Sequence, residues 1–409
     1  MDSIIFHIDV NSAFLSWTAL SLLKKGEAAD LRLVPSVIGG DSQKRHGVVL
    51  AKSTPAKSYG IKTGEPILHA LKKCPSLIIA PPDHSMYREY SHLLMEYLTS
   101  ICPKIQQVSI DECYMDYSPI SHLYSSPMEG AFFLKNSIRE KFGFTVNIGI
   151  SDRKVLAKMA SDFQKPDLVH TLFSYEIKEK LWPLPVERLY MCGRSSVETL
   201  KKLEIITIGD LARSDPYILS LHLKSHGVSL WEFANGQDLS TVDSSPYVAK
   251  GIGNSTTLSK DLTTIQEAYP VLLSLAESVG KRLRSCGQCA SMISCEIKYS
   301  NFHSVSHQTT LTSPTDSTTT LYETACQLFH TLWNQDPIRL LGIRTSKLTD
   351  ASAPKQLSLF DTNFSPSFAI SEVSLKEEKL KKLDSALDQI KNKYGEDAVI
   401  RGSLLSKKV

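Results

Sequence analysis

Acidic side chains follow two short apolar segments of the sequence, at the point where each segment ends. Asp9 closes the apolar run that begins at residue 3, and Asp111 and Glu112 follow the run over residues 105–110. Both runs have the composition of buried strands. A carboxylate at the end of a buried strand is costly unless it is paired, hydrogen-bonded or bound to a cation. If the two strands are neighbours, these acids converge, and carboxylate oxygens are ligands that Mg²⁺ prefers.

The chemistry that such a site supports is phosphoryl transfer. Two ions held by carboxylates can bind the attacking and the leaving oxygens of an in-line displacement. A metal-dependent nuclease would use the same carboxylates, and acids at strand ends also serve simply as turn formers or helix caps. The spacing alone leaves these alternatives open.

The elements that must position these acids form one α+β unit over residues 1–166. The expected strands cover residues 3–10, 33–39, 47–51, 105–110 and 145–151, and the expected helices cover residues 12–24, 86–101, 127–142 and 153–164. Further along, residues 186–236 have a wholly helical pattern, and residues 237–248 have the composition of a linker. Residues 249–348 predict the order helix, strand, strand, helix, strand, which is a second α+β unit.

The C-terminal part of the chain differs in composition. Residues 349–371 are rich in Ser, Pro, Ala and Thr, which predicts a flexible tail. Residues 375–393 predict a charged amphipathic helix. Its apolar face carries Leu380, Leu383, Leu387 and Ile390.

The overall composition describes an ordinary soluble globular protein. The chain has 409 residues, 42% of them hydrophobic and 22% charged, with a formal net charge of +3. At about 150 residues per domain, this length corresponds to between two and four domains. No apolar run approaches the ~20 residues needed to span a bilayer, and residues 1–6 lack the charge pattern of a signal peptide. A cytoplasmic protein with no membrane partner is therefore expected.

The cysteines do not indicate a metal site. Of the eight cysteines, only Cys286 and Cys289 form a close pair, and Cys295 is the nearest third. Because a structural zinc site needs four ligands, we expect thiols in a reducing cytosol.

Short motifs around the acids, and others in the same order along the chain, resemble the Y-family translesion DNA polymerases, most closely the bacterial DNA polymerase IV and UmuC-like branch. The motifs are Phe6–Phe14, Ser109–Asp116, Asn147–Ser151 with Leu156–Pro166, Gly251–Leu258 and Pro337–Ile343. Each is short, but together they cover nearly the whole chain, which makes the resemblance specific.

The resemblance implies an α+β right-hand polymerase. The implied domains are a palm of residues 1–25 and 76–166, fingers of residues 26–75, a helix-hairpin-helix thumb of residues 167–236, a linker of residues 237–248, a little finger of residues 249–348 and a tail of residues 349–409.

The resemblance also implies roles for the motif residues. Asp9, Asp111 and Glu112 would be the catalytic carboxylates, and together with the backbone carbonyl of Val10 they would hold two Mg²⁺ ions, which Mn²⁺ can replace. Phe14 lies five residues after Asp9, where the family places an aromatic steric gate. A ring packed against the sugar leaves no room for a 2′-hydroxyl group, so deoxynucleotides would be selected. The alternative for Phe14 is a core aromatic on an amphipathic helix.

The implied nucleotide contacts include one departure from the family pattern. The family often grips the triphosphate with a Tyr and an Arg three residues apart, and Thr54 and Lys57 occupy those positions here. Lys supplies charge without the bidentate geometry of Arg. Lys165 would add a further phosphate contact, unless these lysines form a solvated face. The remaining nucleotide-binding candidates are Asn11, Ser12 and Ala13.

The implied DNA contacts lie in the later domains. Residues 186–212 resemble a helix-hairpin-helix, which offers backbone N–H groups to a phosphate. Met191 stands where a first glycine is usual, and only Gly193 remains. In the little finger, the candidates to face the DNA backbone are Lys298, Arg339 and Arg344.

A short peptide in the tail resembles the bacterial sliding-clamp-binding motif. It is formed by Gln356, Leu357, Leu359 and Phe360. Small apolar clusters in polar tails often dock into partner grooves. The alternative is that this segment packs back on its own domain.

The resemblance as a whole implies a template-directed, low-fidelity DNA polymerase without proofreading, active in DNA repair and damage tolerance. Its partners would be primer-template DNA, dNTPs and the sliding clamp, and it would be a cytoplasmic, nucleoid-associated bacterial monomer. The alternative is a catalytically weak DNA-binding module that is recruited to the clamp.

Overall fold

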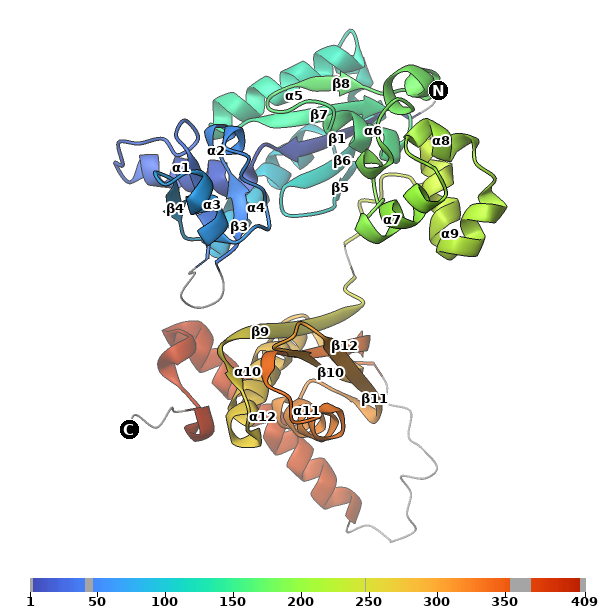
Figure 1. Ribbon diagram of the computed structural model, residues 1–409. Helices are drawn as coiled ribbons and strands as arrows, with labels where there is room; N and C mark the ends of the chain where they lie inside the picture. Colours follow the sequence, from blue (N-terminus) through green and yellow to red (C-terminus); the bar gives the residue numbers. More distant parts are fainter. Residues whose placement is uncertain (1–2, 41–46, 247, 354–368, 405–409) are drawn as a thin grey trace. The chain divides into compact units, whose positions relative to one another are not determined.

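The computed structural model describes residues 3–40, 47–246, 248–353 and 369–404, with only the backbone described for residues 369–378 and 403. Among these residues, those up to 246 form one compact unit and those from 248 onward form a second. Each unit is described by itself below (Figure 1).

The centre of the first unit is a sheet in the order β5-β6-β1-β7-β8. Its strands are β1 (Ile5–Val10), β5 (Ile105–Gln107), β6 (Glu112–Asp116), β7 (Val146–Ser151) and β8 (Val169–Thr171). The central strand β1 runs antiparallel to both of its neighbours, β6 and β7. The strand predicted over residues 105–110 is only β5, which pairs with β6 and not with β1, so the prediction that it ends in the acids was wrong. The acids instead lie at the start of β6, and β6 is the neighbour of β1.

Successive side chains of β1 point to opposite faces of the sheet and so lie in two different environments. Phe6, Ile8 and Val10 are buried in the main core of the unit. That core is built with α1 (Ala13–Lys24), α4 (His84–Ile101), the short helix η2 (Ser118–Leu123) and α5 (Pro127–Phe142). The expected helices over residues 12–24, 86–101 and 127–142 are confirmed by α1, α4 and α5.

The other face of β1 carries His7 and Asp9 and is covered by α6 (Lys154–Ser161). Gly149 on β7 makes this close packing possible. A Cβ atom at position 149 would lie 2.0 Å from the carbonyl oxygen of Ala157 and 2.5 Å from the amide nitrogen of Ser161. Because those atoms belong to the backbone of α6, only glycine lets the helix lie this close to the sheet.

Two smaller substructures complete the first unit. One is a sheet in the order β3-β2-β4, made of β2 (Ser36–Gly39), β3 (Val49–Lys52) and β4 (Ile78–Ala80) with α2 (Thr54–Ser58) and α3 (Ile67–Lys73). The other is helical, as predicted for residues 186–236, and its core is shared with α6. It contains η3 (Ser174–Glu176), η4 (Ile177–Leu181), η5 (Val186–Arg188), α7 (Arg194–Lys202), α8 (Ile208–Arg213) and α9 (Pro216–Ala234).

The second unit is a sheet in the order β11-β10-β12-β9 with helices on one face. Its elements are β9 (Gly251–Leu262), α10 (Ile265–Ser285), β10 (Gln288–Tyr299), β11 (Ser304–Thr315), α11 (Thr318–Leu332) and β12 (Ile338–Asp350). The predicted order lacked the first strand, and this prediction was wrong. β9 was missed because its sequence is rich in Gly, Ser and Thr, and many of its side chains are exposed.

The C-terminal helix α12 (Ala369–Tyr394), with η6 (Glu396–Ala398) and η7 (Gly402–Leu404), belongs to the second unit. It contacts α10 through ion pairs, of which Arg284 to Asp388 measures 2.6 Å and Lys391 to Glu277 measures 3.0 Å. The prediction that residues 349–409 form a separate tail is therefore wrong for this helix. The helix is docked largely through charged residues, and Leu383 on its predicted apolar face is 50% exposed.

Two further observations concern the described parts of the chain. No helix there combines the length and the apolar character needed to cross a lipid bilayer. The eight cysteines all lie in described segments and form no disulfide.

Candidate active site

The acids at the strand ends converge on one side of the sheet. Asp9 on β1 and Glu112 on β6 are direct partners in the antiparallel register. Asp111 immediately precedes β6, and its carbonyl oxygen accepts a hydrogen bond of 3.0 Å from the amide of Val10. Strand pairing therefore brings the predicted carboxylate residues together, although they are about a hundred residues apart in the sequence.

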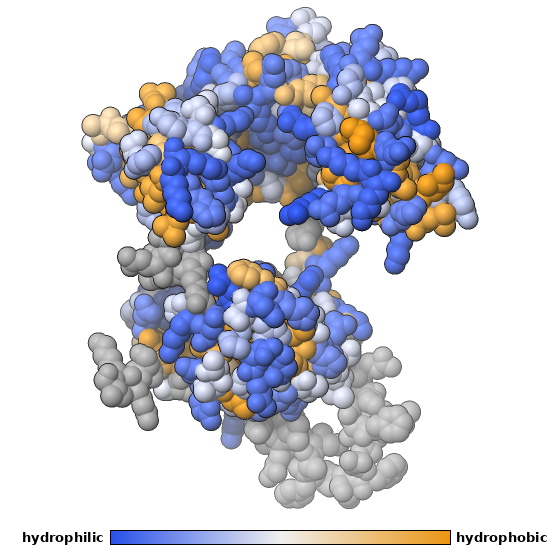
Figure 2. Space-filling model, viewed as in Figure 1, coloured by the Kyte–Doolittle hydropathy of each residue, from blue (hydrophilic) through white to orange (hydrophobic). Residues whose placement is uncertain are grey.

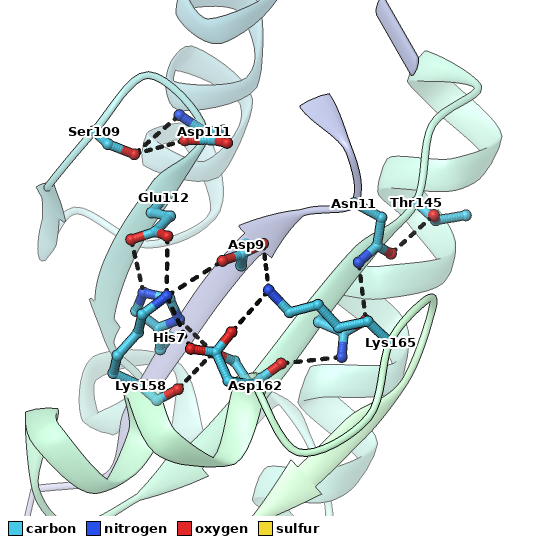
Figure 3. A network of polar contacts seen from close by, with 12 residues as sticks. His7, Asp9, Asn11, Ser109, Asp111, Glu112, Thr145, Lys158, Asp162 and Lys165 are labelled. Atoms are coloured by element: carbon cyan, nitrogen blue, oxygen red, sulfur yellow. Dashed lines mark hydrogen bonds and ion pairs between the residues drawn. The ribbon is translucent and has the colours of Figure 1, made fainter. Parts of the chain in front are cut away.

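Two lysines from the segment after β7 lie among these carboxylates (Figure 3). Lys158 on α6 contacts Glu112 at 2.9 Å and Asp9 at 3.4 Å. Lys165 contacts Asp9 at 2.9 Å and Asp162 at 2.9 Å. The Lys158 side chain is only 10% exposed, so α6 places a buried cation directly over the strand-end acids.

Burial and charge act in opposite directions on this network. Burial raises the pKa of Asp9, whereas the ammonium groups of Lys165 and Lys158 lower it. The pKa of Glu112 is lowered, first by its contact with His7 and then by Lys158. Burial opposes the charge of Lys158, but the surrounding carboxylates outweigh it and raise the pKa of this lysine. The cluster is thus a set of buried charges that depend on one another.

His7 is a buried part of the site that the sequence did not single out. Its Nδ1 atom lies 2.8 Å from the hydroxyl of Ser161, and its Nε2 atom lies 3.6 Å from a carboxylate oxygen of Glu112. Burial lowers the pKa of the ring, which favours the uncharged form. Strand alternation could have indicated His7, because residue 7 of a strand lies on the same face of the sheet as residue 9.

The Asp111 carboxylate contacts Ser109 rather than the two lysines. Its Oδ1 atom accepts a hydrogen bond of 2.7 Å from the Ser109 hydroxyl, and Figure 3 shows its side chain beside Ser109. In the part of the chain that the structure describes, no three His, Cys, Asp or Glu side chains are gathered as a metal ion would need them. The oxygen donors here, carboxylates and backbone carbonyls, are nevertheless the kind that a hard divalent cation prefers. In this structure two ammonium groups supply the positive charge beside Asp9 and Glu112.

A pocket of about 280 Å³ opens beside the acids. Asp9, Val10, Ser12, Ala13, Phe14 and Asp111 line one side, and Leu50, Ala51, Lys52 and Thr63 line the other. Figure 2 shows that the surface of the first unit is hollowed between the side of α1–α3 and the side of α7–α9, and that the hollow is largely hydrophilic. The pocket thus combines charged, hydroxyl and aromatic groups next to the carboxylates.

Phe14 contributes an aromatic wall to this pocket. Its ring stacks on Tyr87 with the centroids 4.4 Å apart and the planes 7° from parallel. Ser12 precedes it with a left-handed backbone (φ 47°), and α1 begins directly afterwards. The ring is thereby fixed by packing while one part of it remains open to the pocket.

Some residues predicted to contact the nucleotide do not line this pocket. Thr54 and Lys57 are exposed on α2 and do not line the pocket, whereas Lys52 and Thr63, which the sequence did not single out, do. The Asn11 side chain is buried, donates 3.0 Å to Asn147 and accepts from Thr145 and the Asp167 amide. The family pattern gave spacing along the chain, but the direction of each side chain follows from the strand and helix that carry it.

The predicted DNA contacts occupy separate places in the two units. In the first unit, Gly193 is the N-cap residue of α7, and Met191 before it is 58% exposed with a left-handed backbone. In the second unit, the buried residues of β10 alternate with Ser294, Glu296 and Lys298, which places Lys298 on the face opposite α10 and α11. Arg344 lines a groove on that face, and Arg339 lies 4.7 Å from the Phe302 ring centre. The candidates Gln356, Leu357, Leu359 and Phe360 lie outside the described residues.

A central mixed sheet with acids at its strand ends, a small α/β substructure across a polar pocket and a helical substructure beside it have the arrangement of a right-hand polymerase fold. A solved Y-family DNA polymerase chimera, Dbh-Dpo4(243-245)-Dbh, shares this fold with a TM-score of 0.74 at 21% identity, and the similarity covers 85% of this chain and 99% of that chain. Its sequence identity is low, so this likeness concerns the fold.

Comparison of sequences identifies the particular family. The model of the impB/mucB/samB family matches residues 8–162, and that of the family's C-terminal domain matches residues 249–359. The chain is 46% identical to a DNA polymerase IV of Clostridium acetobutylicum over 100% of this chain and 99% of that protein. It is 34% identical to DNA polymerase IV 1 of Bacillus subtilis over 99% of this chain and 94% of that protein. The chain therefore belongs to the impB/mucB/samB family, which is the Y family of DNA polymerases.

Proposed function

We propose that the protein is a template-directed, low-fidelity translesion polymerase that transfers deoxynucleotides from dNTPs to the 3′-hydroxyl group of a primer, without proofreading. The observation that carries this proposal is the register pairing of Asp9 with Glu112 beside a pocket whose wall is Phe14. The acids supply ligands for cations, the pocket supplies a place for a nucleotide, and family membership supplies the reaction class.

Asp9, Asp111, Glu112 and the Val10 carbonyl would hold two Mg²⁺ ions, with Mn²⁺ able to replace them. When bound, such ions stabilise both the attacking and the leaving oxygens of a phosphoryl transfer. The side chains have complementary tasks. With Asp9 bound to a cation, Lys165 would be free to pair with a phosphate oxygen of the incoming nucleotide. Lys158 keeps Asp162 as a second partner.

The pocket lining supports selection of the sugar. The Phe14 ring is held from behind by Tyr87 and cannot retreat without breaking that stack. Ser12 and Ala13 precede it on the same wall and can contact the sugar and phosphates, and Lys52 and Thr63 face them. A ribonucleotide would have to place its 2′-hydroxyl group against the fixed ring.

We propose a grip on DNA that does not depend on sequence. Gly193 at the start of α7 leaves backbone N–H groups available to a phosphate, and Lys298, Arg339 and Arg344 supply positive charge on the second unit. Such contacts weaken as salt is raised. The Gln356–Phe360 peptide would recruit a sliding clamp and raise the effective concentration of DNA. We further propose that the protein acts as a monomer at the bacterial nucleoid in the cytoplasm.

The test is extension of a labelled primer on a template with Mg²⁺ and each dNTP. We expect extension by the parent protein, and its loss in Asp111→Ala and in Glu112→Ala. The matched control is Glu96→Ala, which removes an exposed carboxylate from α4 in the same unit. Extension that survives either active-site substitution would contradict the site. A parent that binds DNA but never extends a primer would favour the alternative of a DNA-binding module recruited to the clamp.

A further inference from the structure

We propose that His7 is a positioning residue for Glu112, whose Oε2 atom it holds through an Nε2–H group. The inference rests on the proposed metal site and adds a residue to its support. The Nε2 atom of His7 lies 3.6 Å from Oε2 of Glu112, and Lys158 contacts the other oxygen, Oε1, at 2.9 Å. Different groups therefore hold the two oxygens of one carboxylate (Figure 3).

The ring of His7 is fully enclosed by the protein, so it cannot contact a ligand directly. It is 0% exposed, it lies on the side of β1 that α6 covers, and its edge contacts Tyr114 at a centroid distance of 4.9 Å. Its Nδ1 atom faces the Ser161 hydroxyl at 2.8 Å. Among the described residues Nε2 makes no hydrogen bond, and its contact with a charged group is with the Glu112 carboxylate at 3.6 Å, just beyond hydrogen-bond distance.

The neighbours of the ring decide which nitrogen carries its hydrogen. An uncharged imidazole has one N–H group. If the hydrogen were on Nδ1, Nε2 would present a lone pair to the negative charge of Glu112, which is repulsive. If it is on Nε2, that contact becomes attractive. Nδ1 then accepts the hydrogen of Ser161, and the Ser161 hydroxyl gives up its donation to the carbonyl oxygen of Lys158, 2.8 Å away. The negative charge of Glu112 beside Nε2 therefore favours the Nε2–H tautomer.

This arrangement lets Glu112 exchange one partner and keep the other. Lys158 contacts Asp9 and Asp162 as well as Glu112, so it can release Oε1 to a cation. His7 holds Oε2 independently and preserves the orientation of the carboxylate during that exchange. Loss of a group that orients a metal ligand typically lowers metal affinity or activity about 10- to 100-fold.

The tautomer can be measured on the unaltered full-length chain. Nitrogen-15 NMR of histidine-labelled protein distinguishes a protonated from an unprotonated ring nitrogen, and the His7 signal is assigned by its absence from the spectrum of His7→Gln. We expect Nε2 to carry the hydrogen. Protonation of Nδ1 alone would overturn the inference, whether or not any variant folds.

A pair of amide variants tests the holding role. The amide of His7→Gln reaches about as far as Nε2, whereas the shorter amide of His7→Asn reaches only the place of Nδ1. The full-length proteins are bound to a primer-template that ends in a dideoxynucleotide, together with a dNTP, and free Mn²⁺ is counted by electron paramagnetic resonance. We expect His7→Gln to bind Mn²⁺ within about threefold of the parent and His7→Asn to bind it at least about tenfold more weakly. Thermal melts of both variants report folding.

The outcomes separate this inference from the proposed function. Equal Mn²⁺ affinity in the parent and both variants, or equal loss in both variants, would overturn the role of His7 and leave the metal site intact. A parent that binds no Mn²⁺ in this complex would overturn the metal site and the inference that depends on it.

Discussion

Lys158 satisfies several carboxylates at once, and its charge is what allows them to be buried together. Its ammonium group contacts Asp9, Glu112 and Asp162, and its side chain is 10% exposed. Removal of one partner from a buried ion pair leaves the other charge uncompensated, which costs far more than the net contribution of the pair. A divalent cation at the same acids would supply the missing positive charge.

We therefore expect Lys158→Met to lower the free energy of unfolding by about 3 kcal/mol in the absence of metal. Because a cation that binds only the folded state stabilises it by mass action, Mg²⁺ should raise the melting temperature of this variant more than that of the parent. Thermal denaturation with and without Mg²⁺ measures both effects. Lys158→Arg, which keeps the charge, is the matched control. An equal Mg²⁺ response in Lys158→Met and the parent would contradict this account of the acids.

Phe14 allows a second prediction at the scale of one residue. Replacing its ring in Phe14→Ala opens the pocket wall, and we expect incorporation of ribonucleotides relative to deoxynucleotides to rise about 10- to 200-fold, the range that steric differences in a pocket supply. Phe14→Tyr keeps the ring and should keep the discrimination. Single-nucleotide incorporation kinetics with matched rNTP and dNTP measure the ratio. Unchanged selectivity in Phe14→Ala would place the sugar elsewhere.

At the scale of elements, the position of α6 decides whether the site exists. This helix brings Lys158 over β1, and it can do so because Gly149 on β7 has no side chain at the crossing. A methyl group there would lie 2.0 Å from a backbone oxygen of α6, closer than any side-chain adjustment can relieve. Strand and helix would have to separate.

We expect Gly149→Ala to lower the free energy of unfolding by about 3 kcal/mol or more, at the upper end of overpacking effects. Primer extension should fall with it, because Lys158 and Ser161 move with α6. Gly193→Ala is the matched control for stability, since a Cβ atom there has no neighbour within 4 Å and its backbone is not left-handed. Urea denaturation measures the difference. If Gly149→Ala were as stable as Gly193→Ala, α6 would not be held by this contact.

The elements also explain which features of the fold and the site could be predicted from the sequence. The apolar runs before Asp9 and Asp111 indicated that the acids would converge if their strands were neighbours, because strand patterns are local. Which strands pair is not local: the partner of β1 is β6, which begins at Glu112, and not the predicted strand over residues 105–110. The roles of Lys158 and His7 were not predicted, since they depend on which helix lies on which face of the sheet. Thr54 was placed by family spacing, yet Lys52 lines the pocket, because β3 ends at Lys52 and Thr54 is already an exposed residue of α2. The strand β9 was missed because its polar, Gly-containing sequence lacks a strand pattern.

At the scale of the whole molecule, the C-terminal helix changes how the proposed clamp peptide must be tested. Asp384 on α12 is 3% exposed and accepts from the Thr318 amide at 2.9 Å and from Arg401 at 3.2 Å. Arg284 on α10 pairs with Asp388 on α12. A truncation after Lys355 would remove the clamp peptide and also α12, so it would leave Arg284 without its acidic partners.

We therefore expect substitutions, rather than truncation, to separate clamp binding from stability. Leu359→Ala combined with Phe360→Ala should abolish the stimulation of synthesis by a sliding clamp, because the apolar side chains supply the docking energy in such peptides. Synthesis without the clamp and the melting temperature should both remain those of the parent, whereas truncation after Lys355 should lower the melting temperature. Ser358→Ala, within the same peptide, is the matched control and should keep the stimulation. Primer extension on circular templates, with and without loaded clamp, distinguishes these results, and a double variant still stimulated like the parent would remove Gln356–Phe360 from the proposed interface.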